Sequence, residues 1–208
     1  TKGQFSATAE KGLSLKKQGE NPYMPIDICM EALVSNATFV ARSFAGNPKQ
    51  VKELIKAALA HDGIALLDII SPCVTFNNQV NAFHSYAWGK DHEEPLQEIS
   101  YIAPRSEIML EREMAEGEVR EVAMHDGSTV ILKNLEKGYD TSSRIEALRV
   151  MEEAQSNKWM LTGLLYLDTS KPNLTSQYNL VDTPLNRLTE ADLRPDRSAI
   201  DKVNALMF

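Results

Sequence analysis

The chain of 208 residues has 43% hydrophobic and 25% charged residues, a composition typical of a globular protein that buries a substantial core. A formal net charge of -7 provides no basic surface, which excludes nucleic acid as a main partner. No apolar run approaches the roughly 20 residues that span a bilayer. Two cysteines form no disulfide framework. We therefore expect a cytoplasmic protein with no membrane partner.

The first residues of the chain suggest that it begins inside a domain. It starts with Thr1 instead of methionine, in the polar and glycine-containing stretch "TKGQFSATAEKG". Such a stretch is typical of a loop between two elements. We expect a fragment or a processed chain.

The first eighty residues alternate between helical and extended patterns. In chain order, we expect a loop over residues 1–23, a short amphipathic helix over 25–34, a strand over 37–45, a helix within 46–63 and a strand over 64–70. Asn47 and Pro48 provide the cap and the first residue of the longer helix. The last strand is almost continuously apolar, as in strands that a parallel sheet buries on both faces. This order predicts an α/β fold with an open parallel sheet.

Beyond about residue 80 the pattern changes to α+β. Alternating residues on both sides of Asp126-Gly127 predict a hairpin. A helix over 142–155, capped by Ser142 or Ser143, a strand over 159–168 and a short helix over 197–207 follow. We divide the chain into residues 1–80, the C-terminal part of the open-sheet domain, and residues 81–208, an extension that packs on another surface.

Cys73 is the candidate site residue that the pattern itself indicates. It lies three residues after Ile70, and open α/β sheets bind ligands beyond the carboxyl ends of their strands. A cysteine is more often a small buried hydrophobe than a ligand. However, a thiolate in a loop that offers hydrogen-bond donors suits an iron–sulfur cluster, for which about three more thiolates must come from elsewhere. Cys29 lies on the apolar face of a helix and is expected to pack in the core.

Other side chains carry weaker signals. Lys2 is either a solvated surface lysine or a charge partner for a substrate carboxylate. The four histidines show no metal-ligand spacing, and the chain contains no glycine-rich phosphate loop and no CxxC motif. Spacing alone therefore predicts an α/β protein with one unusual cysteine.

Two stretches, "TKGQFSATAEKG" at residues 1–12 and "ALLDIISPCVTFNN" at residues 65–78, resemble the β subunit of 2-oxoacid:ferredoxin oxidoreductases. "NPYMPID", "ATFVARSFAGNPKQ", "HEEPL" and the stretch from "TGLLY" to "LRPDRSAID" are similar to the same family, so that the resemblance covers nearly the whole chain. It implies a thiamine diphosphate enzyme that oxidatively decarboxylates a 2-oxoacid. Coenzyme A would receive the acyl group, and electrons would pass through a [4Fe-4S] cluster to ferredoxin. Residues 1–80 would then be the C-terminal part of the thiamine diphosphate-binding domain.

The resemblance also implies roles for individual residues. The family's "SPCVTFN" cysteine is the last of four cluster ligands, which corresponds to Cys73. The lysine of "TKGQ" resembles the residue that meets the distal carboxylate of 2-oxoglutarate, whereas pyruvate enzymes tend to have glycine there. Lys2 therefore favours 2-oxoglutarate as substrate. Thr1, Gly3 and Gln4 would line the same cofactor edge.

The chain also departs from the family pattern. The other three cluster cysteines and the "GDG" motif for the pyrophosphate and Mg²⁺ lie upstream of "TKGQ" in the family and are not in this sequence. The resemblance therefore implies the C-terminal part of a β subunit, which acts with the N-terminal part of that subunit and with an α subunit. The alternative is a docking module without a cofactor, with Trp88, Tyr101 and Trp159 as interface anchors.

Overall fold

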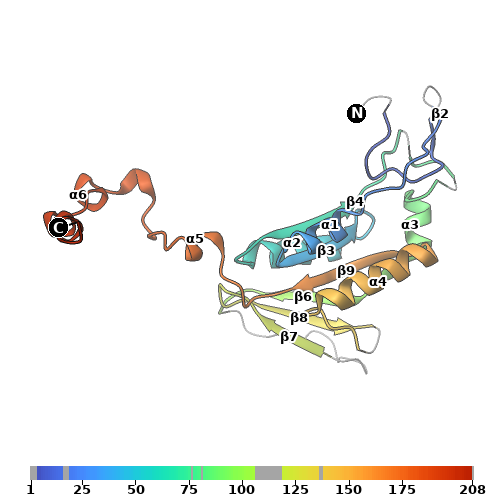
Figure 1. The fold of residues 1–208 in the computed structure, drawn as a ribbon. Helices are drawn as coiled ribbons and strands as arrows, with labels where there is room; N and C mark the ends of the chain where they lie inside the picture. The colour runs from blue at the N-terminus through green and yellow to red at the C-terminus, as the bar shows by residue number, and fades with distance from the viewer. Residues whose placement is uncertain are drawn as a thin grey trace. The chain divides into compact units, whose positions relative to one another are not determined.

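The structure is a computed structural model (Figure 1), and it describes residues 4–15, 19–75, 77–80, 82–105, 119–135 and 138–207. Contacts between residues divide the chain into two compact units, Thr1–Asn173 and Leu174–Phe208. The boundary at residue 80 that we inferred from the sequence pattern stays a prediction.

A mixed four-stranded sheet forms the centre of the first unit. Its strands, in the order β4-β3-β9-β5, are β4 (Ala65–Ile70), β3 (Phe39–Phe44), β9 (Met160–Leu167) and β5 (Glu93–Pro95). β3 pairs with β4 in parallel and with β9 in antiparallel orientation, and β9 pairs with β5 in parallel. The α/β class is confirmed. The wholly parallel sheet is not, because the late strand β9 inserts beside β3 in the opposite direction.

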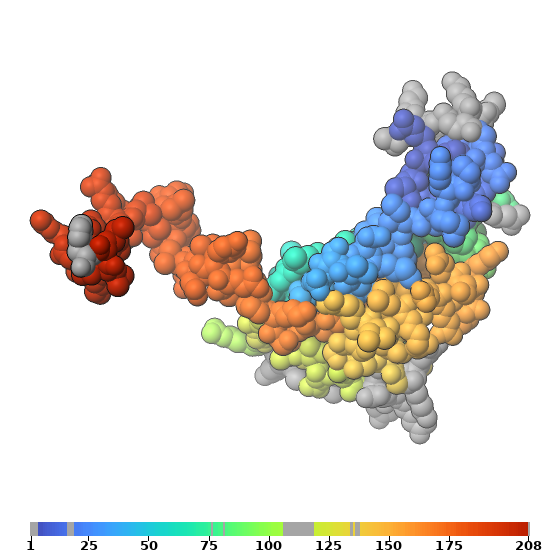
Figure 2. All heavy atoms as spheres, viewed as in Figure 1, coloured from blue at the N-terminus to red at the C-terminus, as the bar shows by residue number. Residues whose placement is uncertain are grey.

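Two apolar layers cover the two faces of this sheet. Alternate residues of a strand point to opposite faces, and accordingly Val40 belongs to one buried cluster while Phe39 and Ala41 belong to the other. The first cluster includes residues of α1 (Ile28–Val34) and α4 (Arg144–Asn157), two helices that contact each other and lie side by side in Figure 2. The second includes residues of α2 (Pro48–Ala60) and of a small antiparallel sheet. That sheet has the order β6-β8-β7, with β6 (Gln97–Ile102), β8 (Thr129–Asn134) and β7 (Val119–Ala123).

Local capping explains where the helices begin. The side chain of Asn47 accepts a hydrogen bond from the backbone N–H of Gln50 at 3.3 Å, and Pro48 opens α2 as predicted. Ser143, one of the two predicted caps, accepts from the N–H of Glu146 at 3.3 Å at the start of α4. α1 begins later than the sequence pattern indicated, because Asp27 provides its cap.

The hairpin predicted around Asp126-Gly127 is formed by β7 and β8. Its turn is held by a hydrogen bond of 2.9 Å from the N–H of Ser128 to Asp126, and Gly127 adopts a φ of +81°. In the segment expected to be a loop, the two short strands β1 (Ser14–Leu15) and β2 (Gly19–Glu20) pair with each other. Helix α3 (Tyr86–His92), which the sequence pattern did not indicate, follows the segment after β4.

Strand β4 differs from the prediction that both of its faces are buried. Ala65 is exposed, and the side chain of Ile69 keeps 39% of its surface accessible. Within the described part of the chain, β4 pairs only with β3 and is therefore an edge strand. On α2, the apolar residues Ile55 and Leu59 are also exposed. The apolar character of β4 was identified correctly, but the described residues of the first unit cover it only in part, with Leu66 and Leu67 partly buried against the two clusters.

The second unit consists of short helices without a core of their own. They are α5 (Leu174–Gln177), the 3₁₀ helix η1 (Leu185–Arg187), α6 (Glu190–Leu193) and α7 (Arg197–Ala205). α7 confirms the short helix predicted near the C-terminus. None of the residues described in this unit is buried.

Candidate functional site

The candidate site lies where the parallel strands β3 and β4 end. Figure 1 shows the N-terminal loops and the segment that follows β4 at this same end of the sheet. We call the described residues within 4–27 and 71–85 the carboxyl edge. In open α/β sheets, ligands bind beyond this end of the strands.

A buried asparagine organises the N-terminal part of the carboxyl edge. Asn21 is 2% exposed and donates from its side-chain amide to the carbonyls of Ala9 and Glu10 at 3.0 and 2.9 Å. The N–H of Ile26 donates to the carbonyl of Ala7 at 2.9 Å. These contacts fold the segment back on itself, so that the residues after Gln4 are held close to the start of α1.

The segment that carries Cys73 is fixed by amide side chains. The N–H of Asn77 donates to the carbonyl of Cys73 at 2.7 Å, and the Asn77 side chain donates to the carbonyl of Phe83 at 3.2 Å. Asn78 accepts from the N–H of Tyr86 at 3.0 Å. The polar residues after Cys73 thus bind backbone groups of their own segment. None of the described residues donates a hydrogen bond to the thiol of Cys73, which is exposed.

The two cysteines have opposite environments. The thiol of Cys29 is fully buried and lies 3.8 Å from the carbonyl oxygen of Ala41. Burial raises the pKa of Cys29 to about 12, so the group stays a neutral thiol. The prediction that Cys29 packs in the core is confirmed, whereas Cys73 is the accessible cysteine.

A partly buried arginine lies directly below the carboxyl edge. Arg42 of β3 donates from Nη2 to Oδ1 of Asp27 at 2.6 Å and from Nε to Oδ2 of Asp68 at 2.9 Å. Its side chain is 13% exposed, and both aspartate side chains are 22% exposed. This group was not predicted from the sequence. The signal was one charge in each of two apolar strands, "FVARSF" and "ALLDII".

Aromatic rings pack between the edge and α3. His84 lies 3.9 Å from the ring of Phe83, and Trp88 stacks on His92 at 4.3 Å. Burial, together with the charge of Arg42, lowers the pKa of His84 to about 4, so this imidazole is neutral at pH 7. Trp88 is half-buried in this cluster of aromatic rings, whereas the sequence suggested an exposed interface anchor.

The remaining two aromatic anchors considered from the sequence differ from each other. Trp159 is 41% exposed. Tyr101 is half-buried, with the Lys56 ammonium 6.0 Å from its ring centroid.

The other predicted site residues are placed only in part. Thr1, Lys2 and Gly3 lie outside the described residues, and Gln4 is exposed. Among the described residues, no three His, Cys, Asp or Glu side chains are grouped so that they could hold a metal ion. From this part of the chain, an iron–sulfur cluster at the carboxyl edge would take Cys73 alone.

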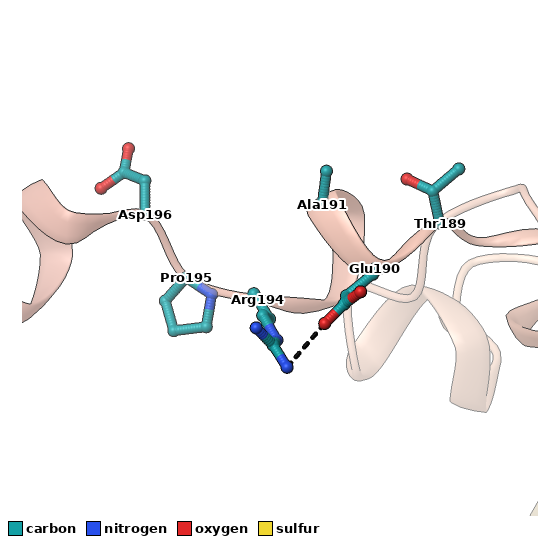
Figure 3. Close-up of a pocket in the computed structure, with 6 residues that line it drawn as sticks. All are labelled: Thr189, Glu190, Ala191, Arg194, Pro195 and Asp196. Carbon is teal, nitrogen blue, oxygen red and sulfur yellow. Dashed lines mark ion pairs between the residues drawn. The ribbon is translucent and has the colours of Figure 1, made fainter.

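A hollow in the second unit offers no comparable chemistry. It is lined by Thr189, Glu190, Ala191, Arg194, Pro195 and Asp196. Figure 3 shows that these six residues belong to one continuous stretch, in which Glu190 and Arg194 form an ion pair of 2.6 Å. In the part of the chain that the structure describes, no helix has the length and apolar character needed to cross a bilayer.

Comparisons with known proteins identify relatives of part of the chain. It is 44% identical over 82 residues to a 2-oxoacid:ferredoxin oxidoreductase subunit beta of Sulfolobus sp, a match covering 38% of this chain and 26% of the relative. It is 35% identical over 82 residues to the 2-oxoglutarate oxidoreductase subunit KorB of Mycobacterium tuberculosis, covering 38% of this chain and 21% of the relative. The matches span about a quarter of these relatives. No family model matches the chain.

A solved structure supports the fold. The 2-oxoglutarate:ferredoxin oxidoreductase from Magnetococcus marinus, with 2-oxoglutarate, coenzyme A and succinyl-CoA bound, matches with a TM-score of 0.61 and 23% identity. The match covers 96% of this chain and 52% of the other. Over the matched part of its sequence, the chain is homologous to the β subunit of 2-oxoacid:ferredoxin oxidoreductases.

Proposed function

We propose that the chain is part of the β subunit of a thiamine diphosphate-dependent 2-oxoacid:ferredoxin oxidoreductase. Such an enzyme converts a 2-oxoacid and coenzyme A to an acyl-CoA and CO₂ and reduces ferredoxin. The observation that carries the proposal is the exposed thiol of Cys73 beyond the end of β4, in a chain homologous to these β subunits. Its position is where an α/β sheet binds cofactors.

We assign to Cys73 the role of one ligand of a [4Fe-4S] cluster. An exposed, unpaired thiol fits this role because a ligand must be accessible and lose its proton. Pro72 is buried and the Asn77 N–H binds the carbonyl of Cys73, so the backbone on both sides of the sulfur is held. The cluster, when bound, accepts electrons one at a time. Three further ligands would come from the N-terminal part of the β subunit.

The open side of the sheet supports assembly with other polypeptide. β4 has one unpaired edge within the described residues, and an apolar groove lies beside it. The groove is lined by Ala45, Pro48, Val51, Lys52, Ile55, Lys56 and Ile69. Unpaired strand edges and apolar surface of this kind are normally covered. We propose that the N-terminal part of the β subunit covers the β4 edge and the groove, and that the α subunit completes the enzyme. Mg²⁺ and thiamine diphosphate would be held mostly by the N-terminal part and the α subunit. Thr1, Gly3 and Gln4 would border the cofactor.

For the substrate we propose 2-oxoglutarate, with succinyl-CoA as product. A lysine in a pocket needs a counter-charge, because an unpaired buried charge is costly. The distal carboxylate of 2-oxoglutarate would pair with Lys2, whereas pyruvate has no second carboxylate. The relatives named for 2-oxoglutarate and the solved structure with bound 2-oxoglutarate favour the same choice.

The role of Cys73 is tested by Cys73→Ser in the assembled enzyme. We expect the low-temperature EPR signal of the reduced cluster to be lost or strongly altered, since serine replaces a thiolate ligand. Cys29→Ala is the matched control, because this buried cysteine is not a ligand, and it should keep the signal. An unchanged cluster signal in Cys73→Ser would refute the assignment. A wild-type complex that assembles without any cluster would instead support the docking module.

The role of Lys2 is tested by Lys2→Gly. We expect kcat/KM for 2-oxoglutarate to fall by ~10- to 100-fold, the loss that corresponds to one charged hydrogen bond. The value for pyruvate should change much less. Steady-state kinetics with both substrates measures the difference, and equal losses on both would contradict the assignment.

A further inference from the structure

We propose that Arg42 is a positioning residue that fixes the two segments of the carboxyl edge relative to each other. The inference rests on the proposed function, because its purpose is to hold the Cys73 segment and the N-terminal segment in register around one cofactor. Arg42 itself lies below the edge and is not a catalytic residue.

The geometry gives Arg42 two different partners at one edge. It lies on β3 between β4 and β9, and Asp68 is its direct neighbour in the register of β4. Its guanidinium uses Nε for Asp68 and Nη2 for Asp27. Because all three side chains are largely shielded from water, these charged hydrogen bonds are screened less than surface pairs.

The Asp27 contact reaches the N-terminal segment. Oδ1 of Asp27 accepts from Arg42 and also from the N–H groups of Cys29 and Met30 at 2.9 and 3.2 Å, where it caps α1. The preceding residue, Ile26, is bound through its N–H to the carbonyl of Ala7. A chain of contacts thus runs from Arg42 to the residues that follow the "TKGQ" stretch.

The Asp68 contact reaches the Cys73 segment. Asp68 lies five residues before Cys73, and β4 continues to Ile70 in regular pairing with β3. A displacement of Asp68 therefore moves the strand end from which the Cys73 segment departs. One guanidinium links both segments that carry the candidate site residues.

The arrangement requires arginine in particular. The planar guanidinium donates in several fixed directions, whereas the lysine ammonium is a point charge on a flexible stem. Lysine at position 42 would keep the charge but would not hold both carboxylates in the same directions. Arg149 on α4 is a matched control, since it also binds two carboxylates, Glu146 and Glu153, but is 58% exposed.

The experiment compares Arg42→Lys and Asp27→Asn with Arg149→Lys in the assembled enzyme. Asparagine is as good a helix cap as aspartate, so Asp27→Asn removes the charge but keeps the start of α1. Hydrogen exchange is measured along the whole chain. KM, the EPR line shape and kcat, expressed per cluster, are measured on the same samples. We expect faster exchange confined to residues 4–27 and 71–85, an altered EPR line shape and a ~10- to 100-fold lower kcat/KM, the size of effect that a small misplacement has. Arg149→Lys should match the wild type.

Two results would overturn the inference. One is unchanged exchange at both segments in Arg42→Lys and Asp27→Asn. The other is faster exchange throughout the first unit while KM and the EPR line shape stay normal. That result would mean that Arg42 only stabilises the fold. If the proposed function is wrong, the wild type itself shows no ferredoxin reduction, and the exchange measurement alone still decides whether Arg42 holds the two segments.

Discussion

The sheet of the first unit and its carboxyl edge are stabilised by different forces. Every residue of β9 is buried, and two apolar clusters cover the sheet. The edge depends instead on directional polar contacts of Asn21, Asn77 and Arg42. Apolar burial provides most of the free energy of folding but little directional information. The region that stabilises this protein and the region that positions its candidate site can therefore be altered separately.

The largest effect is expected in the sheet. Leu164 of β9 is fully buried in the second cluster, so Leu164→Ala should lower the free energy of unfolding by about 2–5 kcal/mol. Ile200→Ala in the second unit, where the side chain is 52% exposed, should change it by less than about 0.5 kcal/mol. Denaturant unfolding measures both. Equal losses would contradict the observation that none of the described residues of the second unit is buried.

A smaller, pH-dependent effect is expected at the edge. His84 has a pKa of about 4 in the folded protein and about 6.5 when unfolded. The unfolded state therefore binds more protons between these values, and stability is lost as the pH falls from about 6.5 towards 4. His84→Asn, which tolerates the φ of +60° at this position, should remove about 2 kcal/mol of the difference in unfolding free energy between pH 7 and pH 5.

The measurement for His84 is denaturant unfolding at both pH values, with wild type and variant side by side. The variant should show a flatter pH dependence while its secondary structure at pH 7 stays the same. A pH dependence equal to that of the wild type would show that the surroundings of His84 do not hold its imidazole neutral.

The sequence predicted the elements whose signals are local. The cap at Asn47, the turn at Asp126-Gly127 and the apolar run of β9 depend on neighbours within a few residues, and each is confirmed. The insertion of β9 between β3 and β5 was not predicted. β3 and β9 pair across more than a hundred residues, and the local hydrophobic pattern of a strand does not indicate such a distant partner. Burial of β4 on both faces was inferred wrongly, because an apolar strand pattern does not say whether the covering surface belongs to the same unit.

The candidate site was predicted only where a motif marked it. Cys73 was singled out by its place after a strand, and the structure locates it, exposed, at that edge. Arg42 was not predicted as part of the site because its role comes from ion pairs with Asp27 and Asp68, which lie fifteen and twenty-six residues away in the sequence. The role of Lys2 as a substrate contact stays a prediction, since it lies outside the described residues.

The most direct test of the account is whether the complete enzyme that contains this chain reduces ferredoxin when both 2-oxoglutarate and coenzyme A are present. We expect reduction that depends on both compounds and on Cys73, with succinyl-CoA formed as ferredoxin is reduced. A correctly assembled complex that retains its cluster and cofactor but reduces no ferredoxin with any 2-oxoacid would contradict it.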